Sequence, residues 1–85
     1  MERNLLTNST YQRGKLLNKH IGKRLRKARR AASYSIHQLA SELNIGTDVL
    51  ADYESGQLQI SPIELLILAD ILDVEFAYFF EGFEG

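Results

Sequence analysis

The side chains with the clearest chemical potential in this sequence are its cations, because all ten lysines and arginines fall within the first 30 of its 85 residues. A single acid, Glu2, accompanies them, so residues 1–30 carry a formal charge of +9. Residues 31–85 hold the other ten acids and no lysine or arginine, which gives −10. This separation predicts a basic segment that meets an anionic partner, or one that lies against the acidic part of its own or a neighbouring subunit. A solvated helix face is the plain alternative.

The other polar residues give little support to catalysis or metal binding. Cysteine is absent, so there is no disulfide framework and no thiolate metal site. His20 and His37 lack further metal-ligating residues at a suitable spacing. Ser35, His37 and Asp48 are better explained as a helix cap and surface residues than as a catalytic triad. We therefore expect no enzyme activity, no metal and no cofactor.

A helix over residues 15–32 would position most of the cations. Apolar residues recur there at helical spacing and leave the basic residues on the other sides. This apolar stripe consists of Leu17, Ile21, Leu25, Ala28 and Ala32. Residues 1–14 are polar and end at Gly14, so we predict a flexible basic arm there. Arg3 and Arg13 give this arm its positive charge.

Two short helices joined by a tight turn are predicted next. Ser35 and Gln38 have the spacing of a capping box, which starts a helix over residues 36–43. Asn44 tolerates a left-handed backbone and ends this helix. A second helix follows over residues 47–54.

The last part of the chain predicts helices over residues 62–72 and 75–80. Ser61 and Pro62 combine an N-cap with a proline at the first helical position. The first of these helices is apolar nearly all round and the second is rich in aromatic residues, so the apolar surface exceeds what a monomer core needs. The residues assigned on this basis to a homodimer interface are Ile63, Ile67, Ile71, Tyr78 and Phe83.

The stretch YSIHQLASELNIGTDVLADYESG resembles the helix-turn-helix of the XRE family, the Cro and lambda-repressor-like DNA-binding proteins. The lead-in IGKRLRKAR and the later LADILDVEFAYFF extend the likeness from Ile21 to Gly82. The resemblance implies an all-α, compact five-helix, lambda-repressor-like domain over residues 15–85, preceded by the basic N-terminal arm. It also implies that double-stranded DNA is the partner, with the helix over residues 47–54 in the major groove.

Site residues follow from the same resemblance. The residues expected to face the bases are Thr47, Asp48, Val49, Ala51 and Asp52. Phosphate contacts are expected from Lys15, Lys19, Lys23, Arg26, Lys27, Arg30 and His37. Arg29 and Glu54 correspond to a structural pair that ties the first helix to the end of the recognition helix. The sequence departs from the family pattern in two respects, because the recognition helix is acidic and the loop after it, Gln57-Leu58-Gln59, has no cation.

These observations predict a sequence-specific transcriptional regulator, a dimeric repressor acting on a palindromic operator. The alternative is a protein-interaction or co-regulator module that keeps the fold but binds DNA weakly or not at all. The first ten residues lack the apolar core of a signal peptide, and no apolar run approaches the ~20 residues of a membrane span. We therefore expect a cytoplasmic protein with no membrane partner.

Overall fold

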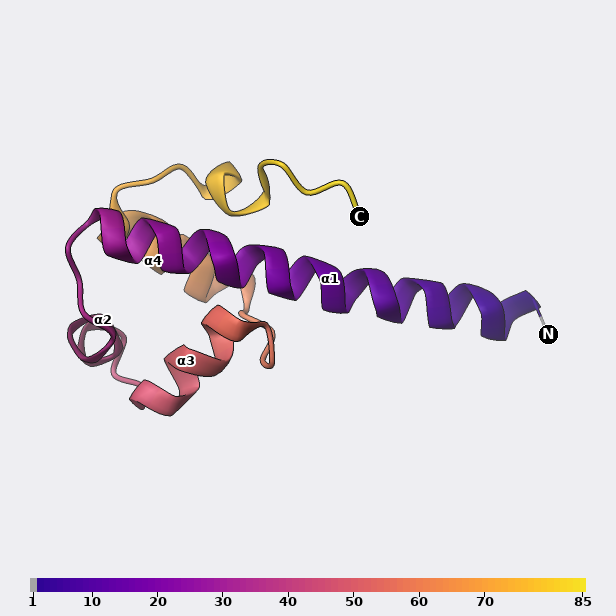
Figure 1. Cartoon of the computed structure of the whole chain (residues 1–85), viewed down its shortest axis with the longest axis horizontal. Coiled ribbons are helices and arrows are strands. Elements are labelled where there is room, and N and C mark those ends of the chain that lie inside the picture. Colours follow the sequence, from indigo (N-terminus) through magenta and orange to yellow (C-terminus); the bar gives the residue numbers. More distant parts are fainter. Residues whose placement is uncertain (1) are drawn as a thin grey trace.

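The computed structural model describes residues 2–85, with side chains described from Thr10 onward. Over that range the chain is all-helical, with four α-helices and one short 3-10 helix, so the predicted all-α fold class is confirmed. Figure 1 shows that α1 (Glu2–Ala31) runs the length of the molecule and extends well past the other elements at its N-terminal end. The principal dimensions are 47 × 24 × 18 Å.

The start predicted for the first helix is wrong, because α1 begins at Glu2 and not near Lys15. Gly14, taken as a breaker, lies inside the helix with no atom within 4 Å of where its Cβ would be. A glycine in an exposed helix costs only about 1 kcal/mol relative to alanine, and no proline precedes Pro62 to stop the helix. Flexibility of residues 1–14 stays a prediction, and the Arg3 side chain lies outside those described.

Helices α2 (Ile36–Leu43) and α3 (Thr47–Ser55) form the two-helix unit. The Ser35 hydroxyl accepts from the Gln38 amide at 3.1 Å, and the Gln38 side chain accepts from the Ser35 amide at 2.8 Å. Asn44 adopts a left-handed φ of 56° and ends α2. Gly56 ends α3 with φ 83°, a conformation that favours glycine.

Helix α4 (Pro62–Leu72) and the 3-10 helix η1 (Phe76–Phe80) complete the chain. The Ser61 hydroxyl caps α4 by accepting from the Glu64 amide at 3.1 Å. The last element was expected as a helix over residues 75–80. It takes the tighter 3-10 form, with hydrogen bonds between residues three apart, over Phe76–Phe80.

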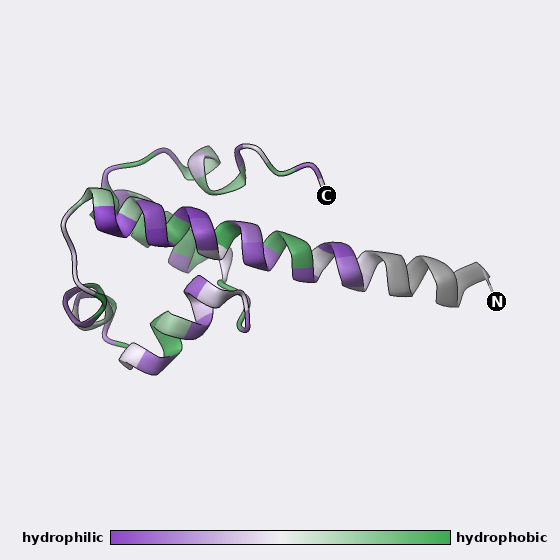
Figure 2. Cartoon of the chain, in the orientation of Figure 1, coloured by the Kyte–Doolittle hydropathy of each residue, from purple (hydrophilic) through white to green (hydrophobic). Residues whose placement is uncertain are grey.

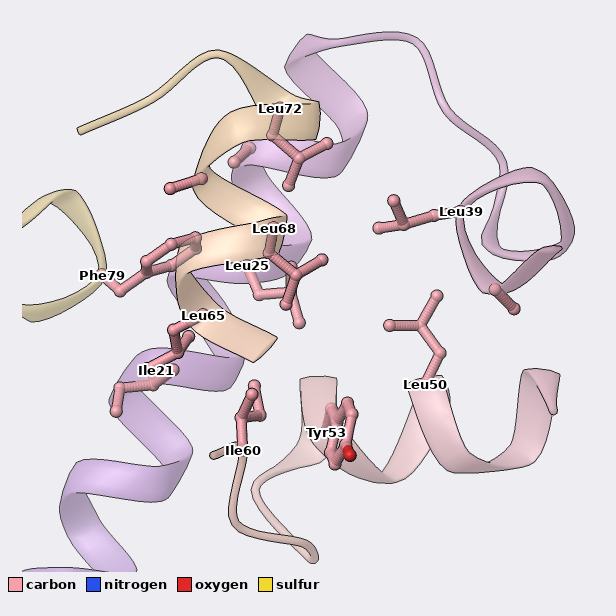
Figure 3. Packing of buried hydrophobic residues seen from close by; sticks show 13 residues of the cluster. Ile21, Leu25, Leu39, Leu50, Tyr53, Ile60, Leu65, Leu68, Leu72 and Phe79 are labelled. Carbon is pink, nitrogen blue, oxygen red and sulfur yellow. The ribbon is translucent and has the colours of Figure 1, made fainter. Parts of the chain in front are cut away.

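The core takes one fully buried side chain from each element. Figure 3 shows Leu25 of α1, Leu39 of α2, Leu50 of α3, Leu68 of α4 and Phe79 of η1 converging on one region. Polar and apolar residues alternate along α1 in Figure 2, so one side of this helix enters the core while the other faces solvent. The core therefore fixes α3 relative to α1, and this arrangement positions the candidate site.

Candidate nucleic-acid interface

Helix α3 turns two carboxylates and a methyl group to solvent. Asp48, Ala51 and Asp52 are exposed, and Thr47 is half-buried at the start of the helix. Val49 was expected on the same outward face, but it is half-buried and packs against the core. The outward face of α3 is thus acidic.

The opposite side of α3 is anchored by buried residues. Leu50 is fully buried, and the Tyr53 hydroxyl donates to the carboxylate of Glu64 on α4, with oxygen–oxygen distances of 2.9 and 3.0 Å. Burial raises the pKa of Tyr53, and the hydrogen bond to Glu64 and its negative charge raise it further. These contacts hold α3 in place by its inner side and leave the outer side open.

Arg29 and Glu54 lie together where α1 meets α3. Arg29 Nε donates to Glu54 Oε2 at 2.6 Å, and Nη2 donates to Oε1 at 3.1 Å, which is the two-pronged geometry that arginine makes with a carboxylate. Arg29 Nη1 also donates to the carbonyl of Tyr34 at 2.9 Å. The Arg29 and Glu54 side chains are only 11% and 8% exposed, and the bond to Glu54 raises the pKa of Arg29. Because its donors are directed inward to protein acceptors, Arg29 links α1, the following turn and α3.

Two glycines allow α1 to approach the end of α3 closely, and sequence reasoning did not identify the first of them. A Cβ at Gly22 of α1 would collide with the backbone carbonyls of Tyr53 and Glu54. A Cβ at Gly56 would collide with the backbone of Lys19. Gly22 interrupts the apolar stripe of α1 without any local turn signal, so only the packing reveals its role.

Four of the expected phosphate-binding cations form one group, the outer cluster, on the solvent side of α1. The group consists of Lys23, Arg26, Lys27 and Arg30, which together line a shallow depression. All four are exposed. Lys23 and Lys27 are each two residues from the fully buried Leu25, which is a rotation of about 200° around the helix axis. They therefore lie on the side of α1 opposite to the core. Among the described residues, none of the four makes an ion pair, since the two ion pairs found there use Arg24 and Arg29.

Lys19 lies in a different place, in a groove between α1 and the loop after α3. The lining residues are Tyr11, Lys15, Asn18 and Lys19 of α1 and Gly56, Gln57, Leu58 and Gln59 of the loop. The Lys15 ammonium stands 4.8 Å from the centre of the Tyr11 ring, which is a cation–π distance. The structure therefore separates the expected phosphate-binding cations into two groups.

Two further basic side chains, His37 and Arg24, belong to neither of these groups. His37 is exposed on the first turn of α2 and lines neither the depression of the outer cluster nor the groove that holds Lys19. Arg24 donates to the Tyr78 carbonyl at 2.8 Å and to Glu81 at 3.0 Å, and its guanidinium lies 3.8 Å from the centre of the Tyr78 ring. Arg24 thus holds the C-terminal segment on α1, a role that its place in a basic run did not suggest.

The residues expected at a dimer interface differ in their exposure. Ile63 and Ile67 of α4 are 71% and 46% exposed, and Leu66 between them is 56% exposed. Ile71 and Tyr78 are half-buried and pack against the core. Phe83, also half-buried, stacks against His20 at 5.5 Å between ring centres. Among the side chains that the structure describes, three of the large exposed apolar ones thus lie on α4, while the others lie on α1, in the loop after α3 and on η1.

Residues 2–85 offer neither a metal site nor a membrane-spanning helix. No group of three or more histidine, aspartate or glutamate side chains there is arranged to hold a metal ion. In the same residues, no helix is both long enough and apolar enough to cross a membrane.

Comparison with known sequences identifies the unit formed by α2 and α3. The pattern of the helix-turn-helix family matches residues 25–79, which contain α2, α3, α4, the core residues Leu25 and Ala28 of α1, and Phe79 of η1. The chain belongs to the XRE-type helix-turn-helix family. The resemblance noted in the sequence is therefore confirmed, and in this family's terms α3 is the recognition helix.

Two relatives carry names that agree with this assignment. One is an uncharacterized HTH-type transcriptional regulator of Rickettsia conorii, 35% identical over 68 residues, which cover 80% of this chain and 54% of the relative. The other, of the same description, comes from Rickettsia prowazekii and is 34% identical over 68 residues, covering 80% of this chain and 52% of the relative. This chain therefore spans about half the length of these curated relatives.

Proposed function

We propose that this chain is the DNA-binding domain of a sequence-specific transcriptional regulator that places α3 in the major groove of duplex DNA. The observation that carries the proposal is the arrangement of α2 and α3, whose inner sides are fixed in the core while the outer side of α3 stays exposed. The names of the two relatives, both HTH-type transcriptional regulators, support the regulatory role. Such a protein acts in the cytoplasm of a bacterial cell.

In the proposed complex, Thr47, Asp48, Ala51 and Asp52 face the bases, with Val49 at the edge of this surface. Aspartate accepts hydrogen bonds from the cytosine amino group in the major groove, so the two carboxylates favour a site that contains cytosine. They also repel the phosphates, which means that the binding energy has to come from cations elsewhere. Those cations lie on α1, with His37 on α2 as a further candidate.

The proposed assembly is a homodimer that binds a palindromic operator and represses by covering a promoter. Ile63, Leu66 and Ile67 give the outer side of α4 exposed apolar side chains that a second copy would cover. A twofold dimer places two recognition helices on two half-sites one helical turn apart, which matches a palindrome. Light scattering on the purified chain at micromolar concentration tests the proposed dimer. A monomeric mass at that concentration would contradict it.

A salt titration of binding to a pool of genomic DNA fragments, followed by sequencing of the retained fragments, tests the function. We expect enrichment of a palindromic sequence and an affinity that falls steeply as salt rises. Unselective or absent binding would contradict a sequence-specific regulator.

A second function, a protein-interaction or co-regulator module, is favoured by one observation. Asp48 and Asp52 expose carboxylates on the helix that would face DNA, and no lysine or arginine follows Arg30. In that case the acidic face binds a basic protein segment. This function would be favoured if the chain bound no DNA even at low salt and instead bound a basic peptide. The D48N/D52N variant should then lose binding to that peptide.

A further inference from the structure

The loop after α3 carries no cation that could neutralise the DNA phosphates beside a recognition helix. Residues that flank a recognition helix hold the phosphates on either side of the groove that the helix enters. Here that loop offers two amide side chains and one leucine, Gln57-Leu58-Gln59. If α3 binds DNA, cations beside this loop have to come from another element.

The N-terminal part of α1 brings cations to this loop. Gly56 packs directly on the backbone of Lys19, so the end of α3 is in contact with α1 at this point. Lys15 stands seven residues, close to two turns, before Gly22, so it lies on the side of α1 that packs on α3. Figure 1 shows α3 and the loop after it together on one side of α1, with the N-terminal part of α1 continuing beyond them.

The chemistry of this groove fits a phosphate. Among the residues that line it, Lys15 and Lys19 supply charge while Asn18, Gln57 and Gln59 supply amide groups, and none is an acid. Lys15 and Lys19 make no ion pair within the part of the chain that the structure describes. The two lysines are four residues apart, about 6 Å along the helix axis, so neighbouring phosphates of one strand are within reach of both.

We propose that the groove between α1 and residues 56–59 binds the DNA backbone next to the major groove that α3 enters. Lys15 and Lys19 neutralise phosphates, and the side-chain amides of Asn18, Gln57 and Gln59 donate hydrogen bonds to phosphate oxygens. The extended α1 thereby replaces the basic loop that the sequence lacks. This inference rests on the proposed function and narrows its phosphate contacts to one side of α1, away from Lys23 and Lys27.

Two matched double variants of the whole chain test the proposal. K15Q/K19Q removes two charges from the groove, and K23Q/K27Q removes two from the outer cluster of the same helix. All four lysines are exposed, and glutamine is a good helix former, so both variants keep the helix. The readout is the slope of log affinity against log salt for the DNA fragment that the unmodified chain binds best.

We expect K15Q/K19Q to reduce the salt slope by about 2, because each phosphate contact contributes about 0.9. K23Q/K27Q should change it by less than half as much. If the two variants reduced the salt slope equally, or if K23Q/K27Q reduced it more, the groove would not be the phosphate-binding site. The proposed function would still stand. An unmodified chain that binds no duplex DNA would overturn both.

A gain-of-charge variant tests the groove independently of any substitution in α1. Gln57→Lys adds a cation to the groove without altering α1. We expect its salt slope to rise by about 0.9 and its affinity at low salt to increase. An unchanged slope would overturn the proposal.

Discussion

Helices α1 and α3 can be compared at the surface they share and at the surfaces they turn to solvent. Where they meet, a glycine allows backbone contact and Arg29 forms its two-pronged pair with Glu54, out of reach of most solvent. On their outer sides, α1 carries cations such as Lys23 and Lys27 that make no ion pair within the described residues, while α3 carries Asp48 and Asp52. The shared surface depends on close fit and is insensitive to salt, whereas the outer surfaces act through charges that salt screens. Orientation of the recognition helix and attraction to DNA are thus separate properties, and each can be changed alone.

The largest effect on the shared surface is expected from Arg29→Ala. Glu54 would keep a buried charge with no partner, which costs about 3–5 kcal/mol of the free energy of unfolding. Urea denaturation followed by circular dichroism measures this loss. Glu81→Gln is the control, because the Arg24–Glu81 pair is exposed on the glutamate side and is worth at most about 1 kcal/mol. Similar losses in the two variants would mean that burial of the Arg29–Glu54 pair has no special weight.

A smaller effect is expected from Gly22→Ala, whose new methyl group would meet the carbonyls of Tyr53 and Glu54. Overpacking of this kind costs about 1–3 kcal/mol. Gly14→Ala is the matched control in the same helix, since nothing lies within 4 Å of its Cβ position. It should raise the free energy of unfolding by up to about 1 kcal/mol. A destabilised G14A or a neutral G22A would contradict this account of the two glycines.

The outer surface of α3 is tested by D48N/D52N. Charges 4 Å apart in water interact by about 1 kcal/mol, so removing two repulsive carboxylates should raise non-specific DNA affinity about threefold to tenfold at low salt. Fluorescence anisotropy with a random duplex measures the change. D70N/E75Q, which alters the net charge equally in other elements, should have a smaller effect. An equal gain in DNA affinity in both variants would show that α3 does not face the DNA.

The smallest effect concerns the inner side of α3 and is seen only at high pH. The pKa of Tyr53 is raised above its usual 10.0 in the folded chain, so the unfolded chain loses this proton first as pH rises. The contribution of Tyr53 is therefore complete below about pH 10 and declines as pH rises toward its folded pKa. Denaturation curves between pH 8 and about pH 11 should show this decline. Tyr53→Phe should flatten that part of the profile, and an unchanged slope would exclude Tyr53 as its cause.

Local signals in the sequence predicted much of the fold. The capping box at Ser35 and the Ser61-Pro62 start depend on residues within one helical turn, and the helices over residues 36–43 and 62–72 have the predicted bounds. Gly14 gave a wrong start for α1, because a single glycine weakens an exposed helix without ending it.

Less of the site than of the fold could be predicted from the sequence. The uneven distribution of charge showed which residues could meet an anion, but not where each cation lies. The groove joins Lys15 to Gln57 across 42 positions of the chain, and its existence depends on how α1 packs on the end of α3. The role of Gly22 depends on the same packing. Neither has a local pattern by which it could be predicted.

The separation of charge described for the two parts of the sequence gives the molecule a permanent electric dipole. Its positive end lies along α1 and its negative end among the elements packed against that helix. In the field of a polyanion, such a dipole experiences a torque that turns α1 toward the polyanion before contact. The screening length at physiological salt is about 8 Å, so this alignment acts only in the last stage of approach. The dipole therefore brings α1 to the polyanion first, and α3, which belongs to the negative end, reaches the groove only after a further rotation about the contacts of α1.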